Sequence, residues 1–348
     1  MTIALFVIDT PMQVVNLKEA LKAFNIKQYD IITSDVARAD GYQQLQQLLT
    51  TLAPRKLLAS PTTGSSIKHR IAAYAKHIPY LKSQQYTHVF FSNIRQHWQR
   101  DIVCSLPNAS PVLMDDGNST VMLYDLHFRH QRFFEFPQDT DVKRVNESAD
   151  LRSHYQISTQ PPESLTLFTI FALEPLPWVN IVHNPLSSLV TRHPQCSEQQ
   201  VLLLGIGGVA LNFISESRYI ALLQQVGHKF KGKQITYIPH RITTRKTLDS
   251  IQQQTGFNVI RLDVPVELWL SREKKPPASL VSFFSASLST CALSFPSLTC
   301  YSVDAGLAIW EKAKDAHVFN MPNTNNLEII RIIVDYLRSD DRIKTLKI

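Results

Sequence analysis

Short apolar runs alternate with amphipathic stretches along the first part of the chain. The runs at 3–9, 29–34, 87–93 and 111–115 are rich in Ile, Val, Leu and Phe, and each has the length of a buried strand. The stretch 11–24, which follows the first run, places apolar residues at helical spacing. Strands that alternate with helices in this way predict a parallel sheet with helices on both faces.

The same alternation starts again near residue 200. The run "QVLLLGIGG" at 200–208 predicts a strand that enters a glycine turn, and "QITYIPH" at 234–240 predicts the strand after it. Further strands are predicted at 258–263, 279–287 and 298–304, and helices at 216–230, 243–256, 266–272 and 326–339.

The middle of the chain has a different pattern. The segment "VMLYDLHFRHQRFFEFPQD" at 121–139 mixes aromatic with charged residues and predicts one or two hairpins, whereas 140–200 is rich in proline and predicts loops. We therefore expect an α/β protein of two Rossmann-like domains, 1–185 and 186–325, whose parallel sheets face a central cleft. A closing helix and a basic tail would follow at 326–348. Ligands of such sheets bind at the carboxyl ends of the strands.

Composition supports a folded protein of two ordinary domains. The chain has 348 residues, of which 44% are hydrophobic and 19% charged. Its apolar runs are too short to span a bilayer, and its N-terminus lacks the features of a signal peptide. The four cysteines lack metal-ligand spacing, which favours free thiols in a reducing cytoplasm.

The net charge of +7 adds one expectation about partners. The C-terminal stretch "RSDDRIKTLKI" is either a solvated helix end or a basic tail attracted to anionic lipid or anionic substrates. No aromatic-basic motif of a nucleic-acid reader is present in the sequence, so we do not expect nucleic acid as a partner.

The first candidate site is "MDDGNS" at 114–119, directly after a predicted strand. Asp-Gly is a common turn dipeptide, so Asp115, Asp116 and Gly117 could simply close a hairpin. They could also hold a catalytic base at a strand end, with Gly117 allowing the chain to reverse. Adjacent side chains of an extended segment point to opposite faces, so one of the two aspartates should face the cleft. We favour Asp115, because it ends the strand.

The second candidate site follows two predicted strands of the second half. The glycines at 205, 207 and 208 lack the full dinucleotide fingerprint and predict a tight turn that lets backbone approach a ligand. In "YIPHR", His240 and Arg241 follow Pro239 at a strand end, and Thr243 or Thr244 can cap the next helix. Such a helix start suits an anion such as phosphate, although a solvated surface turn fits equally well.

The third candidate is "SFFSASLST" at 282–290, where Ser285 and Ser287 follow an apolar strand. Hydroxyls at such a turn suit a phosphate, but serines this dense are more often simple turn and cap residues. A Gly-x-Ser-x-Gly elbow is missing from the sequence, and so are paired-ligand histidine spacings. We therefore expect neither a serine hydrolase nor a metal enzyme.

Taken in order, these motifs resemble the bacterial sialyltransferases of glycosyltransferase families 52, 38 and 80, with families 52 and 38 most similar. The Asp-Asp-Gly motif, "LGIGG", "YIPHR", "VPVELWL" and "SFFSASL" follow the order of that group. The resemblance implies a GT-B fold and an inverting, metal-independent transferase that holds CMP-sialic acid mainly in its C-terminal domain. It implies that Asp115 or Asp116 is the general base, that His240 contacts the CMP phosphate and that Ser285 bonds the same phosphate. It places Gly205, Gly207, Pro239, Arg241, Glu267 and Ser287 around the donor.

Two departures from that group concern the phosphate site. The group usually has His-Pro, whereas here Pro239 precedes His240 and Arg241 follows it. The paired serines of the group are usually adjacent, whereas here Ala286 separates them. The donor could therefore be a relative of sialic acid, such as CMP-pseudaminate, CMP-legionaminate or CMP-Kdo.

The expected partners are a CMP-nonulosonate, as co-substrate with no other cofactor, and a glycan acceptor of lipooligosaccharide or capsule. Acceptor loops are expected within 121–185, where "HFRHQRFFEF" offers aromatic and basic groups for an anionic sugar. The expected location is the cytoplasm, or the inner face of the inner membrane through the basic C-terminus, and a homodimer is left open. Two alternatives remain: a GT-B enzyme for another nucleotide sugar, such as CMP-Kdo or a UDP-sugar, and a non-catalytic glycan-binding protein.

Overall fold

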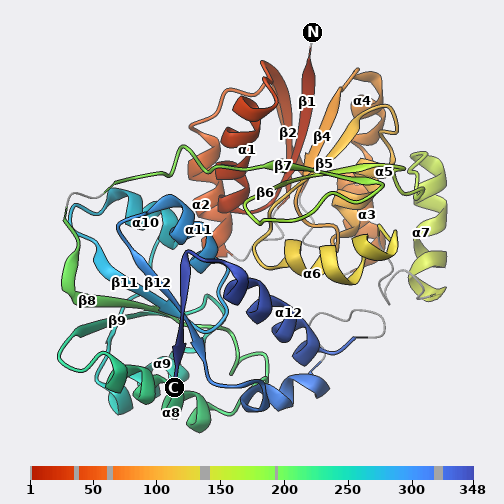
Figure 1. Cartoon of the computed structure of the whole chain (residues 1–348). Coiled ribbons are helices and arrows are strands. Elements are labelled where there is room, and N and C mark those ends of the chain that lie inside the picture. Colours follow the sequence, from red (N-terminus) through yellow and green to blue (C-terminus); the bar gives the residue numbers. More distant parts are fainter. Residues whose placement is uncertain (1, 35–38, 61–65, 134–141, 193–194, 317–323) are drawn as a thin grey trace. The chain divides into compact units, whose positions relative to one another are not determined.

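The computed structural model divides the chain into two compact units, Met1–Ser188 and Leu189–Ile348 (Figure 1). We call them unit 1 and unit 2. The structure describes residues 2–34, 39–60, 66–133, 142–192, 195–316 and 324–348. Each unit contains one sheet with helices packed on it, so each is an α/β domain.

The sheet of unit 1 has seven strands in the order β3-β2-β1-β4-β5-β6-β7, all paired in parallel. Its four central strands, β1, β4, β5 and β6, end at the same edge. Their side chains are almost fully buried because helices cover both faces, as the apolar runs in the sequence predict. The strands are β1 Ile3–Ile8, β2 Gln28–Ser34, β3 Lys56–Ser60, β4 His88–Phe91, β5 Ser110–Met114, β6 Leu165–Thr169 and β7 Val179–His183.

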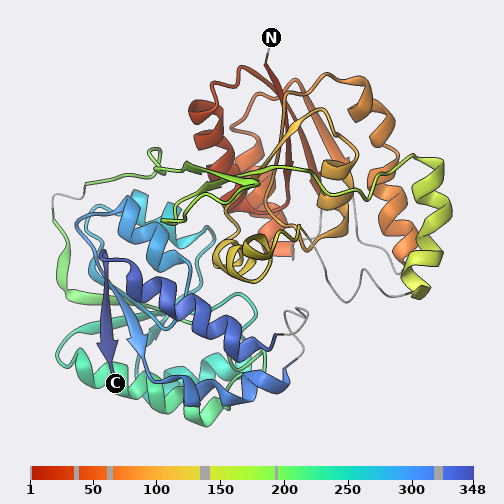
Figure 2. The same ribbon diagram turned by 45° about the vertical axis from the view of Figure 1, so that its right-hand side comes forward.

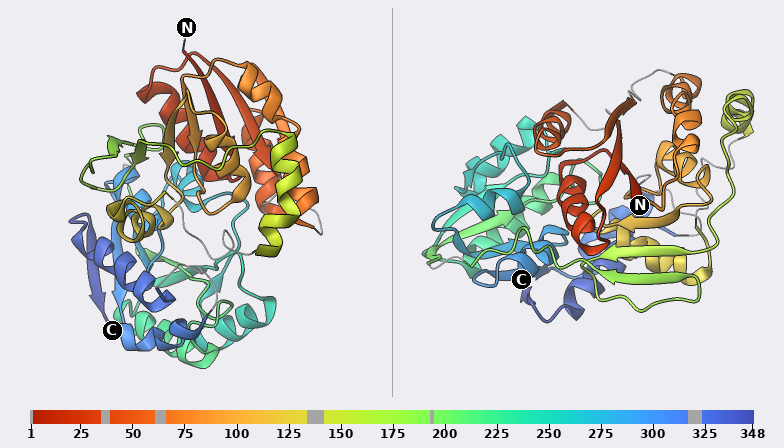
Figure 3. Two further views of the ribbon diagram at one scale, coloured as in Figure 1. Left: turned by 90° about the vertical axis from the view of Figure 1, so that its right-hand side faces the viewer. Right: turned by 90° about the horizontal axis from the view of Figure 1, so that it is seen from above.

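Helices cover the two faces of this sheet. Helices α1 and α2 lie on one side of the strands, and α3, α4, α5 and α7 lie on the other (Figures 1, 2 and 3). Helix α1 begins with Pro11 after the N-cap Thr10, and Gln13 completes a capping box there. The helices are α1 Pro11–Ala23, α2 Ala39–Leu49, α3 Ile67–Ala75, α4 Ile78–Ser83, α5 His97–Cys104, α6 Ser119–Leu126 and α7 Val142–His154, with a 3-10 turn η1 at Phe128–His130.

The sheet of unit 2 has six strands in the order β10-β9-β8-β11-β12-β13, again all parallel. Strand β8 therefore lies between β9 and β11, and the chain leaves all three at one edge. This places the segments after 204, 238 and 282 next to one another. The strands are β8 Ser197–Leu204, β9 Gln234–Ile238, β10 Asn258–Val259, β11 Pro277–Ser282, β12 Thr299–Asp304 and β13 Ile343–Lys347.

One core cluster packs α8, α9, the 3-10 segment η3 and α12 onto a single face of this sheet. Its large members include Tyr219, Tyr237 and Trp310, each at most 3% exposed. Helices α10 and α11 contact each other, and α11 packs against β11 and β12. The helices are α8 Glu216–Lys229, α9 Arg245–Thr255, α10 Val266–Arg272, α11 Ser287–Ser294, η3 Leu307–Asp315 and α12 Asn326–Ser339.

Three sequence-based expectations about elements are wrong. The described part of 121–139 forms α6 and η1 instead of hairpins, because its aromatic residues Tyr124 and Phe128 are buried on a helical segment. Residues 134–139 lie outside the described part of the chain. The proline-rich segment 140–200 contains α7, β6 and β7 as well as loops. The expected C-terminal tail is strand β13, which pairs with β12 from Cys300 to Asp304.

Candidate functional site

Asp115 is the first residue after β5, and its carboxylate is held inside unit 1. One oxygen, Oδ1, accepts a hydrogen bond of 2.7 Å from the hydroxyl of Thr169, and Oδ2 accepts one of 2.7 Å from the backbone N–H of Ile170. Its backbone carbonyl accepts a third bond, of 3.0 Å, from the amide of Asn16 on α1. With only 8% of its surface exposed, Asp115 joins the end of β5 to the end of β6.

Burial is the main influence on the ionisation of Asp115. Removal of the carboxylate from water raises its pKa to about 6, although hydrogen bonds from Thr169, Ile170 and Thr120 favour the charged form. The group therefore titrates much closer to neutrality than an ordinary aspartate. Strongly shifted carboxyl groups are common in active sites, although structural networks also produce them.

Asp116 is more accessible than Asp115. It is half-buried, and it begins the turn that leads into α6. Burial lowers the pKa of Arg95, and the negative charge of nearby Asp116 opposes that effect. Gly117 follows with φ of +61°, a backbone conformation that favours glycine. The predicted role of Gly117 in the chain reversal is therefore consistent with its backbone conformation.

Two buried glutamines fix the neighbouring loops at the same edge of this sheet. Gln99 accepts hydrogen bonds from the backbone of Ser92 and Asn93 after β4, and it donates one of 3.2 Å to Asp9 after β1. Gln13 accepts a bond of 2.7 Å from the backbone N–H of Asp9. These contacts hold the loops after β1 and β4 in place around the end of β5. Neither glutamine is among the residues predicted from the sequence, where the capped start of α1 is the local signal for Gln13.

The glycine turn after β8 leaves no room for side chains. A Cβ atom on Gly205 would lie 2.1 Å from the hydroxyl oxygen of Tyr237, and one on Gly207 would lie 2.7 Å from Ile242 and 3.3 Å from Nδ1 of His240. The backbone N–H of Gly205 donates to the carbonyl of Ile238 at the end of β9. The two predicted motifs, the glycine turn and "YIPHR", therefore lie in direct contact at the end of β8 and β9.

His240 is half-buried in the tight turn that follows β9. The backbone N–H of Ile242 points to Nδ1 at 3.4 Å, and the backbone N–H of Thr243 donates to the carbonyl of His240 at 2.8 Å. If Nδ1 is the acceptor, the proton of a neutral imidazole lies on Nε2, which can then donate to a ligand. Pro239 is half-buried, whereas Arg241 is exposed.

The turn leads into α9, whose start is capped as the sequence predicts. Thr244 is the N-cap residue, and its hydroxyl accepts a bond of 3.2 Å from the backbone N–H of Thr247. A small cavity of about 160 Å³ lies between this helix start and the glycine turn. It is lined by Ile206, Val209, Ala210, Tyr219, Thr243, Thr244 and Thr247.

Ser285 and Ser287 lie at the start of α11, after β11. Both are half-buried, and the hydroxyl of Ser285 accepts a bond of 3.3 Å from the backbone N–H of Ser287. Thr290 donates to the carboxylate of Glu267 at 2.7 Å and contacts the carbonyl of Ser287 at 3.2 Å. Glu267 is 4% exposed, so this carboxylate is held against the first turn of α11. Apart from Glu267, which lies on α10, the predicted donor residues of unit 2 thus follow three adjacent strands, β9, β8 and β11.

Neither a cluster of metal-ligating side chains nor a membrane-spanning helix is found among the described residues. Among them, no three His, Cys, Asp or Glu side chains lie close enough together to hold a metal ion. None of the helices in the described ranges has the length and apolar character needed to cross a bilayer.

No protein-family model and no curated protein matches the chain at the sequence level. Solved structures do match over nearly its whole length. The MnaA–UDP co-structure from S. aureus has a TM-score of 0.51 and 10% identity, covering 98% of this chain and 89% of that one. UDP-GlcNAc 2-epimerase from Methanocaldococcus jannaschii has a TM-score of 0.51 and 12% identity, covering 98% and 94%.

Acinetobacter baumannii MurG is also similar, with a TM-score of 0.47 and 7% identity over 100% of this chain and 86% of that one. Identities this low compare folds and carry no statement about substrates. The prediction of two parallel-sheet α/β domains is confirmed, and the chain has the GT-B type of fold.

Proposed function

We propose that the protein is an inverting glycosyltransferase that moves a sialic acid or related nonulosonic acid from a CMP-activated donor to a hydroxyl of a surface glycan. The observation that carries the proposal is the contact between the glycine turn and His240 at the ends of β8 and β9, with Ser285 at the end of neighbouring β11. In open parallel sheets, this edge is where nucleotide ligands bind.

In this proposal, unit 2 holds the donor and stabilises its leaving group. The bond between the anomeric carbon and the phosphate oxygen breaks, and its electron pair stays on the CMP phosphate. Nε2–H of His240 and the hydroxyl of Ser285 donate hydrogen bonds to this growing charge. Gly207, which has no side chain, lets the turn that carries His240 pack directly against the backbone after β8. Glu267, with one oxygen held by Thr290, offers its other oxygen to hydroxyls of the nucleotide ribose.

In unit 1, the acceptor hydroxyl loses its proton to a carboxylate while its oxygen attacks the anomeric carbon from the opposite face. We assign this base to Asp116 instead of Asp115, which the sequence analysis favoured. Both oxygens of Asp115 already accept bonds from the end of β6, and the residue is buried. Asp116 is the more exposed carboxylate, and it lies near enough to Arg95 for the two charges to interact. Asp115 then acts as a positioning residue for the turn.

The experiment is incubation of the protein with CMP-sialic acid and related CMP-nonulosonates, with detection of released CMP. We expect CMP release without added metal and in the presence of a chelator. His240→Ala should weaken CMP binding and lower the rate, whereas Lys229→Ala, at the exposed end of α8, is the control and should bind CMP like the wild type. Wild-type CMP affinity and rate in His240→Ala would remove His240 from the proposed site.

A UDP-sugar is the second candidate donor, because a structure of the same fold was solved with UDP. The two candidates differ in which nucleotide stabilises the protein. Ligands that bind only the folded state raise the midpoint of thermal unfolding, so CMP should raise it more than UDP or GDP. Stabilisation by UDP and not by CMP would contradict the CMP proposal and favour the second candidate.

As part of the same proposal, we place the protein in the cytoplasm, with peripheral contact to the inner membrane. The basic residues first assigned to a tail now lie on and beside β13, where Lys344 and Lys347 are exposed. Lysines on an edge strand can attract anionic lipid and also discourage pairing with another sheet. Binding to vesicles that contain anionic lipid, compared with neutral vesicles, tests this part.

A further inference from the structure

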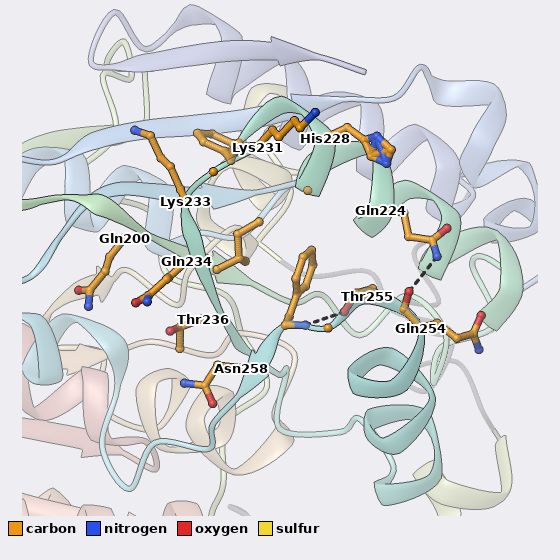
Figure 4. Close-up of a pocket in the computed structure, with 16 residues that line it drawn as sticks. Gln200, Gln224, His228, Lys231, Lys233, Gln234, Thr236, Gln254, Thr255 and Asn258 are labelled. Atoms are coloured by element: carbon orange, nitrogen blue, oxygen red, sulfur yellow. Dashed lines mark hydrogen bonds between the residues drawn. The ribbon is translucent and has the colours of Figure 1, made fainter.

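A second pocket lies in unit 2 at the opposite edge of the sheet from His240. Its lining comes from the early parts of β8, β9 and β10 and from the C-terminal ends of α8 and α9 (Figure 4). The donor motifs follow the carboxyl ends of β8 and β9, so this pocket is a separate place on the unit. Its volume is about 990 Å³, at the upper end of the range for small-molecule sites.

The pocket is polar and positively charged. Lys231 and Lys233 lie along one margin with His228, whereas Gln200, Gln234, Thr236 and Asn258 lie along another (Figure 4). None of the described lining residues is acidic.

Hydrogen bonds within unit 2 fix the walls of this pocket. The amide of Gln224 on α8 donates to the carbonyl of Gln254 on α9 at 3.0 Å, which joins the two helix ends (Figure 4). The backbone N–H of Lys233 donates to the carbonyl of Phe230 at 3.0 Å. Gly232 between the lysines has φ of +86°, which a side chain would disfavour. The turn that carries both lysines is therefore a defined structure.

We propose that this pocket binds an acidic oligosaccharide. Lysine ammonium groups are donors only, and with no acidic residue beside them in the lining they favour a ligand that carries carboxylates. Primary amides both donate and accept, which matches sugar hydroxyls, and four of them line the pocket in addition to Gln224: Gln200, Gln234, Gln254 and Asn258. A simple anion would use the lysines and leave the amides without a role.

This inference goes beyond the proposed transfer reaction and does not depend on it. A glycan held here would be bound without being changed, because His240 and Ser285 lie at the other edge of this sheet and the proposed base belongs to unit 1. For an enzyme that acts on surface glycans, such a site would hold the chain near the enzyme between turnovers and raise its effective concentration.

The test is direct binding of oligomeric sialic acid, measured by calorimetry on the full chain with saturating CMP present. Lys231→Ala/Lys233→Ala should weaken binding by about tenfold or more, as expected for lost hydrogen bonds to charged groups. Lys229→Ala, an exposed lysine at the end of α8 outside the lining, is the matched control and should bind like wild type. Equal affinities of the double variant and the control would overturn the site.

Two further binding measurements distinguish a site that recognises a glycan from a surface that recognises charge alone. Gln200→Ala/Asn258→Ala should weaken binding of oligomeric sialic acid but not of polyglutamate, which carries carboxylates without sugar hydroxyls. If polyglutamate binds as tightly and loses affinity only with the lysines, the pocket recognises charge alone and the glycan assignment is wrong. The assay measures glycan binding and not CMP release. If the protein proves not to be a transferase, the binding result therefore still tests this pocket.

Discussion

The hydroxyl of Thr169, the last residue of β6, donates a hydrogen bond of 2.7 Å to Oδ1 of Asp115, the first residue after β5. This bond crosses between neighbouring strand ends in unit 1. It gives the first aspartate of the Asp-Asp-Gly motif a structural partner, and the turn that follows carries the second aspartate into a half-buried position. The two adjacent carboxylates therefore have different environments and, in our proposal, different roles.

Replacement of Thr169 by valine tests how much this hydrogen bond contributes to the stability of the protein. Thr169→Val keeps the shape of the side chain but removes the donor to a buried carboxylate, so we expect the free energy of unfolding to fall by about 1–3 kcal/mol. Thr169→Ser keeps the hydroxyl and should lose less. Urea denaturation of the two variants and the wild type measures the difference. A valine variant as stable as the serine variant would show that this bond contributes little.

Replacement of Asp116 tests whether this residue is the general base. Asp116→Asn should leave stability within about 1 kcal/mol of wild type, because the residue is half-buried in a turn. Loss of a general base lowers rates by about 10²–10⁴-fold, so transfer should fall in this range while CMP affinity stays unchanged. Asp115→Asn is the comparison and should mainly lose stability. Wild-type transfer by Asp116→Asn, with transfer lost in a folded Asp115→Asn, would reassign the base to Asp115.

The fold could be predicted where apolar runs are long and buried. Strand β1 and the second half of β8 are continuous apolar runs, as expected for a sheet that is covered on both faces. The edge strands lack such runs: β3 exposes three of its five residues, and β13 mixes two lysines and a threonine with two apolar residues. The sequence of the α6 region predicts hairpins because its aromatic residues favour strands. The segment nevertheless forms a helix, since tertiary packing outweighs that local preference.

The candidate site was predictable only where its residues follow strands in the sequence. Asp116 and His240 could be placed this way, because parallel strands bring their carboxyl ends to one edge. The bond from Thr169 to Asp115 and the bond from Gln99 to Asp9 could not, since they join residues 54 and 90 positions apart. Their contribution depends on strand order, and sequence patterns do not report which strands become neighbours.

The close contact between Gly207 and the "YIPHR" turn gives a third prediction. In Gly207→Ala, the new Cβ would lie 2.7 Å from Cδ1 of Ile242, so we expect a loss of about 1–3 kcal/mol in stability from overpacking, together with weaker CMP binding. Ile242→Val removes that Cδ1 atom. The double variant should therefore be more stable than Gly207→Ala alone, with Ile242→Val as the single-variant reference. Strictly additive effects would mean that the two side chains do not meet in this way.

The raised pKa of Asp115 predicts how stability depends on pH. The folded state holds a proton on this group up to about pH 6, whereas an unfolded aspartate releases it near 3.8. The folded state therefore binds more protons in this window, and the contribution of Asp115 to stability is present below the lower value and lost as pH rises through about 6. A shift of this size corresponds to about 3 kcal/mol.

In Asp115→Asn, no group titrates at this position. We therefore compare how the free energy of unfolding changes with pH in the two proteins, and not its absolute values. The free energy of unfolding of the wild type, relative to Asp115→Asn, should decline between pH 4 and pH 6 and then level off, when both are measured by urea denaturation. Asp116→Asn is the matched control, because its own substitution leaves Asp115 free to titrate and should preserve the wild-type decline. Parallel curves for wild type and Asp115→Asn across this window would mean that Asp115 is ionised in the folded protein throughout, held by Thr169 and Ile170 despite its burial.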